Sequence, residues 1–230
     1  MQEQVGQCRK CGVEIFCLDG FLNGVVTPEN ELLCMICADD RFIVDCDAVF
    51  LREYVLADLD ALQALTWQPE IYELLPGWNV SRETRQDWLA NYEIAENRQF
   101  LSAVAAGGRI GELRLRLGIV LKETGEFIGW CCTGIKEELP SQGREIMFAI
   151  SKHHRGKGYT TQAAQGLINY LFENTDISEL HAIALLTNHP SNRVIQKCGF
   201  AFSSIIEIEG DAYNHYLYSK PNGQSRLETQ

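Results

Sequence analysis

Residues 145–164, EIMFAISKHHRGKGYTTQAA, constrain the fold more than any other part of this 230-residue chain. The stretch starts with a short apolar run at residues 146–150, typical of a buried strand, and continues through a cationic turn that contains Gly156 and Gly158. Beyond the turn, apolar residues recur with the spacing of one helical face. The pattern therefore predicts a strand that enters a helix through a glycine-rich turn. The apolar helical face consists of Ala163, Ala164, Leu167, Ile168, Leu171 and Phe172.

Such a turn favours an anionic ligand. It leaves backbone N–H groups unpaired at the positive end of the helix dipole, which is a common phosphate site. Gly156 and Gly158 permit positive φ angles and a close approach of the ligand. Lys152, Arg155 and Lys157 add positive charge in a chain whose net charge is −11. We therefore predict a pyrophosphate-binding loop; the alternative is an ordinary strand–helix loop with charges on its surface.

Two other phosphate loops are excluded by single residues. A Walker A loop requires Ser or Thr after its lysine, but Lys157 is followed by Gly158. The dinucleotide-binding fingerprint requires a third glycine where Thr161 stands, and no long strand–helix–strand unit precedes it.

A second stretch makes the interpretation more specific. Residues 154–163, HRGKGYTTQA, resemble the acyl-CoA loop of the GCN5-related N-acetyltransferase (GNAT) superfamily. Residues 186–200, LTNHPSNRVIQKCGF, are similar to the downstream motif of its ribosomal-protein N-acetyltransferase (RimJ/RimL-like) branch. The motif positions of that branch are held here by Asn188, Ser191, Val194, Lys197, Gly199 and Phe200.

The resemblance spans residues 47–219 and implies an α+β protein with the GNAT fold, a mixed, mostly antiparallel central sheet flanked by helices. It implies an acetyl-CoA-dependent N-acyltransferase, in which a primary amine attacks the thioester directly in a ternary complex. The amine would belong to a protein N-terminus or a small molecule. The cofactor-binding residues that the resemblance implies are Phe148, Ala149, Ile150, Arg155, Gly156, Lys157, Gly158, Tyr159, Thr160 and Asn188.

The catalytic residues depart from the pattern of the superfamily. Many relatives carry a tyrosine as general acid where this chain has Ile195, which has no proton to donate. We therefore expect Ser191 to assist the leaving thiolate, as a hydrogen-bond donor or relay. Glu145, on the central strand, is the candidate general base, and the alternative is a carboxylate that faces solvent. His215 and Tyr216 are weaker candidates.

The N-terminal region carries four cysteines with metal-site spacing: Cys8, Cys11, Cys34 and Cys37. Two CxxC pairs separated by 22 residues are typical of a tetrahedral structural zinc site. Residues 1–45 are too few to bury a sufficient hydrophobic core without a cross-link such as a bound metal ion, so we predict a zinc-ribbon-like module. Four buried thiols without metal are the alternative, and an iron–sulfur cluster is a further one.

The zinc module is not expected to bind DNA. Residues 1–45 carry three basic and eight acidic side chains, a local charge of −5. The negatively charged phosphates of DNA would repel such a module. A stabilising or protein-docking role fits better. We therefore expect a zinc module at residues 1–45, an acetyltransferase domain at 47–219 and a flexible tail at 220–230.

Properties of the whole sequence limit its partners. No apolar run reaches 18 residues and the N-terminus has no signal-peptide character, so we expect a cytoplasmic protein. The net charge of −11 works against nucleic acid and anionic membrane as partners, because both require cationic surfaces. It suits an amine-bearing substrate. The sequence leaves the oligomeric state and the identity of the amine open.

Two other function classes fit the same residues. One is a non-catalytic acyl-CoA-binding module, which the missing tyrosine would allow. The other is a protein-interaction module in which the zinc region carries the function. Turnover of acetyl-CoA with a panel of amines separates both from an enzyme.

The remaining periodicity predicts the order of elements. The apolar segment 66–79 is interpreted either as a lid over the substrate or as additional core. Strands are expected at residues 49–54, 113–122, 126–135, 146–150, 180–186, 200–209 and 212–219, and helices at 57–65, 81–95, 159–172 and 190–198.

Overall fold

The computed structural model describes residues 2–9, 14–18, 20–27, 30–33, 42–139 and 143–220. Two compact units divide the chain, Met1–Phe42 and Ile43–Gln230, and each is described by itself. The boundary lies three residues before the expected one, because Ile43–Asp45 pairs with the next strand of the larger unit. Three residues are too few for a sequence pattern to reveal. Of the expected tail, residues 220–230, all but Lys220 lie outside the described residues.

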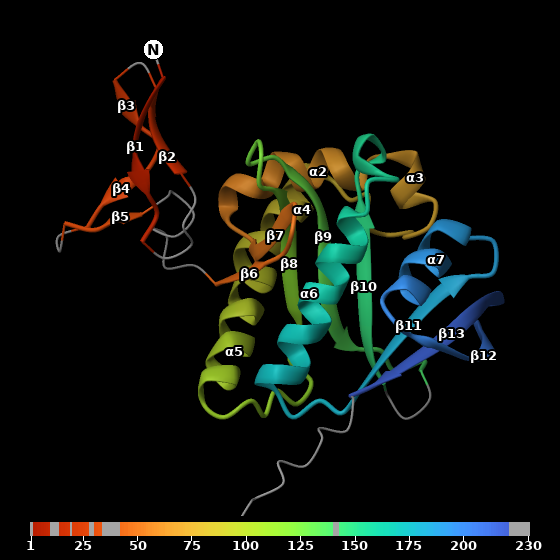
Figure 1. Ribbon diagram of the computed structural model, residues 1–230. Coiled ribbons are helices and arrows are strands. Elements are labelled where there is room, and N and C mark those ends of the chain that lie inside the picture. Colours follow the sequence, from red (N-terminus) through yellow and green to blue (C-terminus); the bar gives the residue numbers. More distant parts are fainter. Residues whose placement is uncertain are drawn as a thin grey trace, which may run out of the picture. The chain divides into compact units, whose positions relative to one another are not determined.

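The smaller unit is built from short strands (Figure 1). A short hairpin turns at Gly20, with Cys17 paired to Leu22 and Gly20 at φ +88°. The strand that precedes it was not predicted from the sequence. Antiparallel pairing joins β1 (Gln2–Gln7), β2 (Glu14–Leu18) and β3 (Phe21–Leu22) in one sheet, and β4 (Val25–Val26) and β5 (Leu32–Leu33) in another.

The larger unit is organised around one eight-stranded sheet in the order β12-β13-β11-β10-β9-β8-β7-β6. Only β10 and β11 pair in parallel; all other neighbours are antiparallel. The expected mixed, mostly antiparallel sheet is therefore confirmed. Its strands are β6 (Ile43–Asp45), β7 (Val49–Glu53), β8 (Leu115–Leu121), β9 (Phe127–Ile135), β10 (Arg144–Ile150), β11 (Glu179–Leu185), β12 (Ala201–Ile208) and β13 (Asp211–Ser219).

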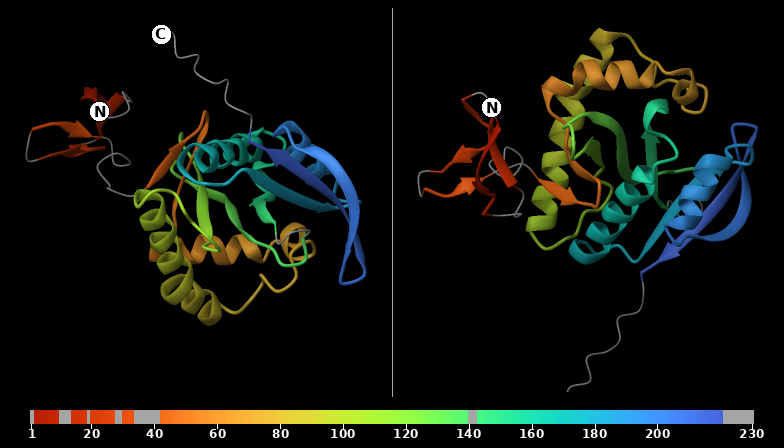
Figure 2. Two further views of the ribbon diagram at one scale, coloured as in Figure 1. Left: turned by 90° about the horizontal axis from the view of Figure 1, so that it is seen from below. Right: turned by 45° about the horizontal axis from the view of Figure 1, so that its top comes forward.

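Helices cover both faces of this sheet (Figure 2). α6 (Tyr159–Asn174) packs on one face against β7, β9 and β10, and its predicted apolar face is buried throughout. α7 (His189–Lys197) packs beside it against β11. The opposite face is covered by α2 (Leu59–Thr66), α4 (Arg82–Trp88), the π-helical turn η2 (Leu89–Glu93) and α5 (Ile94–Ala105). Short turns of helix are η1 (Leu56–Asp58), α3 (Pro69–Tyr72) and η4 (Lys152–His154).

The central strands β10 and β11 separate soon after they meet. Their parallel register contains a single pair, Glu145 with His181. β9 pairs with β10 from Arg144 to Ile150, and β13 pairs with β11 along its whole length. The two strands therefore remain well supported on their outer sides while the sheet opens between them (Figure 1).

Asn192 joins the three elements on the β11 side of this opening. Its side chain is buried at 7% exposure, and its Nδ2 donates to the carbonyls of Leu185 and Asn188 at 2.9 and 2.8 Å. Its Oδ1 accepts from Asn214 Nδ2 at 2.9 Å and from the Tyr216 hydroxyl at 2.7 Å. One amide thus satisfies polar groups of α7, β11 and β13 together.

Replacing this amide should destabilise the larger unit. We expect Asn192→Ala to lower the free energy of unfolding by about 2–4 kcal/mol, because buried carbonyls and a hydroxyl lose their partners. Asn192→Asp keeps the shape but loses both donors and should also destabilise. The matched control is Asn169→Ala on the exposed side of α6, where a change within about 0.5 kcal/mol is expected. Equal urea-unfolding midpoints for both alanine variants would contradict the assignment.

Candidate acyl-CoA site

A cavity of about 720 Å³ lies where β10 and β11 part. Its walls come from both strands, from α7 and the segment before it, from the turn after β10, and from the segment around α3. It brings together residues that are more than a hundred positions apart in the sequence. Predicted site residues on its wall are Glu145, Phe148, Ala149, Ile150, Arg155, Gly156, Thr160, Asn188 and Ser191.

The predicted phosphate loop has the geometry that its glycines imply. Gly156 and Gly158 have φ angles of +77° and +82°, and Gly158 caps α6. The first backbone hydrogen bond of α6 runs from Gln162 N to Gly158 O at 3.1 Å. The N–H groups of Tyr159 and Thr160 therefore have no partner within the helix. Lys157, Gly158 and Tyr159 are predicted site residues that adjoin the cavity wall without forming part of it.

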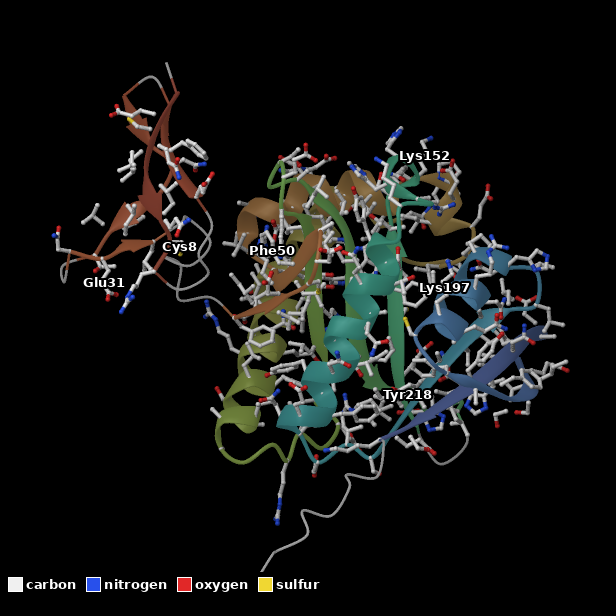
Figure 3. All side chains as sticks on the ribbon, viewed as in Figure 1. Cys8, Glu31, Phe50, Lys152, Lys197 and Tyr218 are labelled. Atoms are coloured by element: carbon white, nitrogen blue, oxygen red, sulfur yellow. The ribbon has the colours of Figure 1, made fainter. Side chains whose placement is uncertain are left out.

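The loop is anchored to the segment around α3. Gln68 accepts from Lys152 N at 2.9 Å and donates to the Ser151 hydroxyl at 3.2 Å. Arg155 Nη2 donates to the Glu70 carbonyl at 2.9 Å, and the Lys152 ammonium lies 3.6 Å from the Glu70 carboxylate. Lys152 extends from the end of β10 in Figure 3. The segment predicted as a lid or additional core thus forms a wall of the cavity, through Ile71, Leu74, Leu75, Pro76 and Trp78.

Asn188, the N-cap of α7, and Ser191 within that helix line the cavity. Asn188 caps this helix, because its Oδ1 accepts from Ser191 N at 3.2 Å. The capping bond occupies the oxygen and leaves the amide NH₂ as the group able to donate to a ligand. Ser191 is half-buried, and Ile195 also lines the wall.

Glu145 lies at the point where the sheet opens. Burial raises the pKa of its carboxyl from 4.5 to about 7, and the charge of Glu138 acts in the same direction while Lys136 and Arg114 oppose it. A carboxyl with this pKa is close to ideal for accepting a proton near neutral pH. Glu145 is half-buried and lies on the wall of the cavity.

The two weaker candidates on β13 are engaged elsewhere. The Tyr216 hydroxyl donates to Asn192, and His215 Nε2 lies 2.9 Å from His181 Nδ1 in a stacked pair. A different residue of β13, Tyr213, lines the cavity instead. Burial raises the pKa of its phenol, as do the charges of Asp211, Glu209 and Glu145.

Sequence analysis missed Tyr213 because its position depends on strand pairing. Tyr213 lies opposite Leu185 of β11, a cavity residue. Because side chains alternate between the two faces of a strand, the sequence of β13 separates Tyr213 and His215 from Tyr216. Only the register of β13 on β11 shows which of these side chains lies at the opening. Lys136 was also missed, and it lines the cavity.

The predicted zinc ligands lie largely outside the described part of the chain. Cys8 is 3% exposed and packs with Ile15 and Leu33 in the smaller unit (Figure 3). Cys11, Cys34 and Cys37 are not among the described residues. Within those residues, no group of three or more His, Cys, Asp or Glu side chains could hold a metal ion. None of the described helices is long and apolar enough to cross a membrane.

Comparison with known proteins agrees with this geometry. The family model described as "Acetyltransferase (GNAT) domain" matches residues 48–201. The chain therefore belongs to the GNAT acetyltransferase family. It is an acetyl-CoA-dependent N-acyltransferase, and the predicted enzyme class and cosubstrate are confirmed.

Individual relatives support the same family. The "Uncharacterized N-acetyltransferase p20" of Bacillus licheniformis is 25% identical over 174 residues, 74% of this chain and 90% of that protein. A GNAT-family acetyltransferase structure from Bacillus anthracis has a TM-score of 0.62 at 16% identity, covering 77% of this chain and 98% of that one. The ribosomal L7/L12 alpha-N-protein acetyltransferase RimL in complex with coenzyme A has a TM-score of 0.59 at 16% identity, with the same coverage.

The phosphate loop can be tested through one glycine. We expect Gly158→Val to weaken coenzyme A binding by at least ~1 kcal/mol, about fivefold, because a β-branched residue at this φ is strained and displaces the N–H groups that begin α6. Isothermal titration measures the change. Gly125→Val is the matched control, since Gly125 has a similar φ of +72° in the β8–β9 turn and lies outside the cavity wall. Unchanged affinity in folded Gly158→Val would contradict the assignment.

Proposed function

We propose that this enzyme acetylates a primary amine by direct attack in a ternary complex, with Glu145 as general base. The observation that carries the proposal is the position of Glu145, a half-buried carboxyl of pKa about 7 on the wall of the cavity. The acceptor belongs to the same class as the protein N-terminus or small amine expected from the sequence. The net charge of −11 favours the approach of such a cationic molecule.

The proposed transfer proceeds in one addition and one elimination. Glu145 takes a proton from the acceptor ammonium, and the free amine nitrogen attacks the thioester carbonyl carbon. The new C–N bond forms, the nitrogen gives up its second proton as the C–S bond breaks, and the departing thiolate takes up one proton, so the products are the amide and free coenzyme A. Backbone N–H groups of β10 near Phe148–Ile150, on the edge that faces the opening, are the proposed donors to the carbonyl oxygen.

Two hydroxyls are candidates to assist the thiolate. Ser191 of α7 and Tyr213 of β13 both line the cavity, whereas Ile195 holds the position of the usual tyrosine. We assign the donor role to Ser191, as the sequence motif suggests, and Tyr213 is the second candidate. A serine hydroxyl acts as a hydrogen-bond donor or relay, and a phenol can donate its proton outright.

Removing the base should affect turnover more than coenzyme binding. We expect Glu145→Gln to lower kcat by about 10²–10⁴-fold while leaving the Kd for acetyl-CoA nearly unchanged. Wild-type kcat/KM should rise with pH through about 7, as Glu145 loses its proton. This rise should be absent from the pH profile of the variant. Wild-type turnover by Glu145→Gln with a true acceptor would exclude the role. Comparing Ser191→Ala with Tyr213→Phe identifies the donor by the larger loss of kcat.

Stability provides an internal check on the same variant. The folded pKa of about 7 lies above the ordinary 4.5, so the folded chain holds a proton that the unfolded chain releases between these values. Stability therefore falls as pH rises across this window. Glu145→Gln should be more stable than wild type at pH 8, by at most about 3 kcal/mol, and about equal to it near pH 4. The two alternative function classes predict the same stability effect but no turnover with any amine.

We also propose one structural zinc ion in the smaller unit, held by Cys8, Cys11, Cys34 and Cys37. Support comes from the spacing of the two CxxC pairs and from the burial of Cys8 beside a core of only a few apolar residues. The role is to stabilise the unit, and docking of a protein partner is the second possibility.

Metal analysis tests the zinc site directly. We expect one zinc per chain in protein purified without chelators, and near-complete loss of zinc in Cys8→Ser, because three thiolates hold zinc far more weakly than four. Cys17→Ser is the control, since Cys17 lies on β2 outside both CxxC pairs, and it should retain the metal. Absence of zinc from the wild type, or equal zinc content in the two variants, would exclude the site.

A further inference from the structure

Arg114, Gly134 and Glu145 lie in one row across three neighbouring strands. Glu145 of β10 pairs with Gly134 of β9. Leu115, the first residue of β8, pairs with Thr133, so Arg114 just before it falls opposite Gly134. Residues opposite one another point to the same face of a sheet. The side chains of Arg114 and Glu145 therefore share one face, two strand spacings (~10 Å) apart at their backbones, with only a glycine between them.

The glycine gives the arginine its path across β9. A Cβ at Gly134 would lie 3.0 Å from Cγ and 3.3 Å from Cδ of Arg114, so the arginine stem lies directly over this residue. Its Nη2 is 3.3 Å from the Ile135 carbonyl. The Arg114 side chain thus extends across β9 toward Glu145, and its positive charge lowers the pKa of that carboxyl.

Arg114 differs from its cationic neighbours in having no acidic partner. Arg116 binds Glu96 and lies 3.9 Å from Glu93, and Lys136 lies 3.5 Å from Glu138. In the part of the chain that the structure describes, Arg114 forms no ion pair. Its residue is exposed, so the guanidinium retains donors for a ligand.

A hollow of about 570 Å³ connects this arginine to the reaction site. Arg114 and Gly134 line it together with Glu145. Four residues line both this hollow and the coenzyme cavity, so the two spaces adjoin: Trp78, Lys136, Glu145 and Met147. An acceptor held here has its amine beside Glu145 and its remaining groups beside Arg114.

We propose that Arg114 selects acceptors that carry a carboxylate a few bonds from the reacting amine. A guanidinium binds a carboxylate through two parallel hydrogen bonds, which fixes its position as well as its charge. Amine and carboxylate occur together in a free α-amino acid and in a peptide with an acidic N-terminal residue. The inference rests on the proposed function, because it takes Glu145 as the site of the amine.

Matched acceptor pairs test this selection. The pairs are phenylalanine against 2-phenylethylamine, and the amidated tripeptides Asp-Ala-Ala against Asn-Ala-Ala. The acidic member of each pair is the one with the carboxylate, phenylalanine or Asp-Ala-Ala. We expect wild-type kcat/KM to be at least about tenfold higher for the acidic member of one pair. The pair that shows the preference identifies the source of the carboxylate. Arg114→Ala should lower the acidic-to-neutral ratio by about 10- to 100-fold. Using the ratio cancels the effect of Arg114 on the pKa of Glu145.

Two further variants separate selection from general charge or folding effects. Arg109→Ala removes the same charge from an exposed residue outside the hollow and should leave the ratio unchanged. Gly134→Val retains the arginine but blocks its path, and should lower the ratio as Arg114→Ala does. An equal ratio in wild type and Arg114→Ala, or no preference for either acidic member, overturns the proposal.

A binding measurement distinguishes this inference from the proposed transfer. Each acidic member is titrated calorimetrically into protein saturated with coenzyme A. We expect one of them to bind wild type and to bind Arg114→Ala at least about tenfold more weakly. Such binding without acetylation of any amine would overturn the proposed transfer and leave the selection by Arg114 standing. Absence of binding by both acidic members overturns the role of Arg114.

Discussion

The separation of β10 from β11 is the constraint on which the rest of the larger unit depends. A strand that loses a neighbour within a sheet exposes backbone groups that must be satisfied by another partner. Here β9 and β13 hold the two strands firmly on their outer sides, so the opening between them persists. An extended ligand with its own amides, such as the pantetheine arm of coenzyme A, can pair with that edge as a further strand would.

The same opening determines the properties of Glu145. The carboxyl stands at the last paired position before the strands part, where it is desolvated but still faces the cavity. Burial that raises its pKa to about 7 makes the folded protein lose stability as pH rises from about 4.5 to about 7 and makes the carboxylate a stronger base. Stability and basicity are therefore in opposition at this residue, which is consistent with the catalytic role proposed for it.

Local sequence patterns predicted those parts of the fold that depend on local chemistry. The apolar face of α6, the positive φ angles of Gly156 and Gly158, and most of the large sheet follow from periodicity and turn residues. What could not be predicted depends on register between distant strands. Tyr213 reaches the cavity, and Arg114 lies across Gly134, only because particular residues stand opposite one another. The π-helical turn η2 and the three-residue strand β6 are too short to produce a periodic signal.

The anchoring of the phosphate loop has a consequence for the order in which ligands are accommodated. Gln68 and Glu70 bind Ser151, Lys152 and Arg155 through hydrogen bonds made within the protein itself. Little conformational entropy is then lost when the coenzyme binds, so its affinity reflects contacts rather than the ordering of a disordered loop. The same segment continues into the cavity wall that contains Trp78, so the contacts that anchor the loop also tether that wall. The acceptor therefore meets a wall whose shape is already set when the coenzyme arrives.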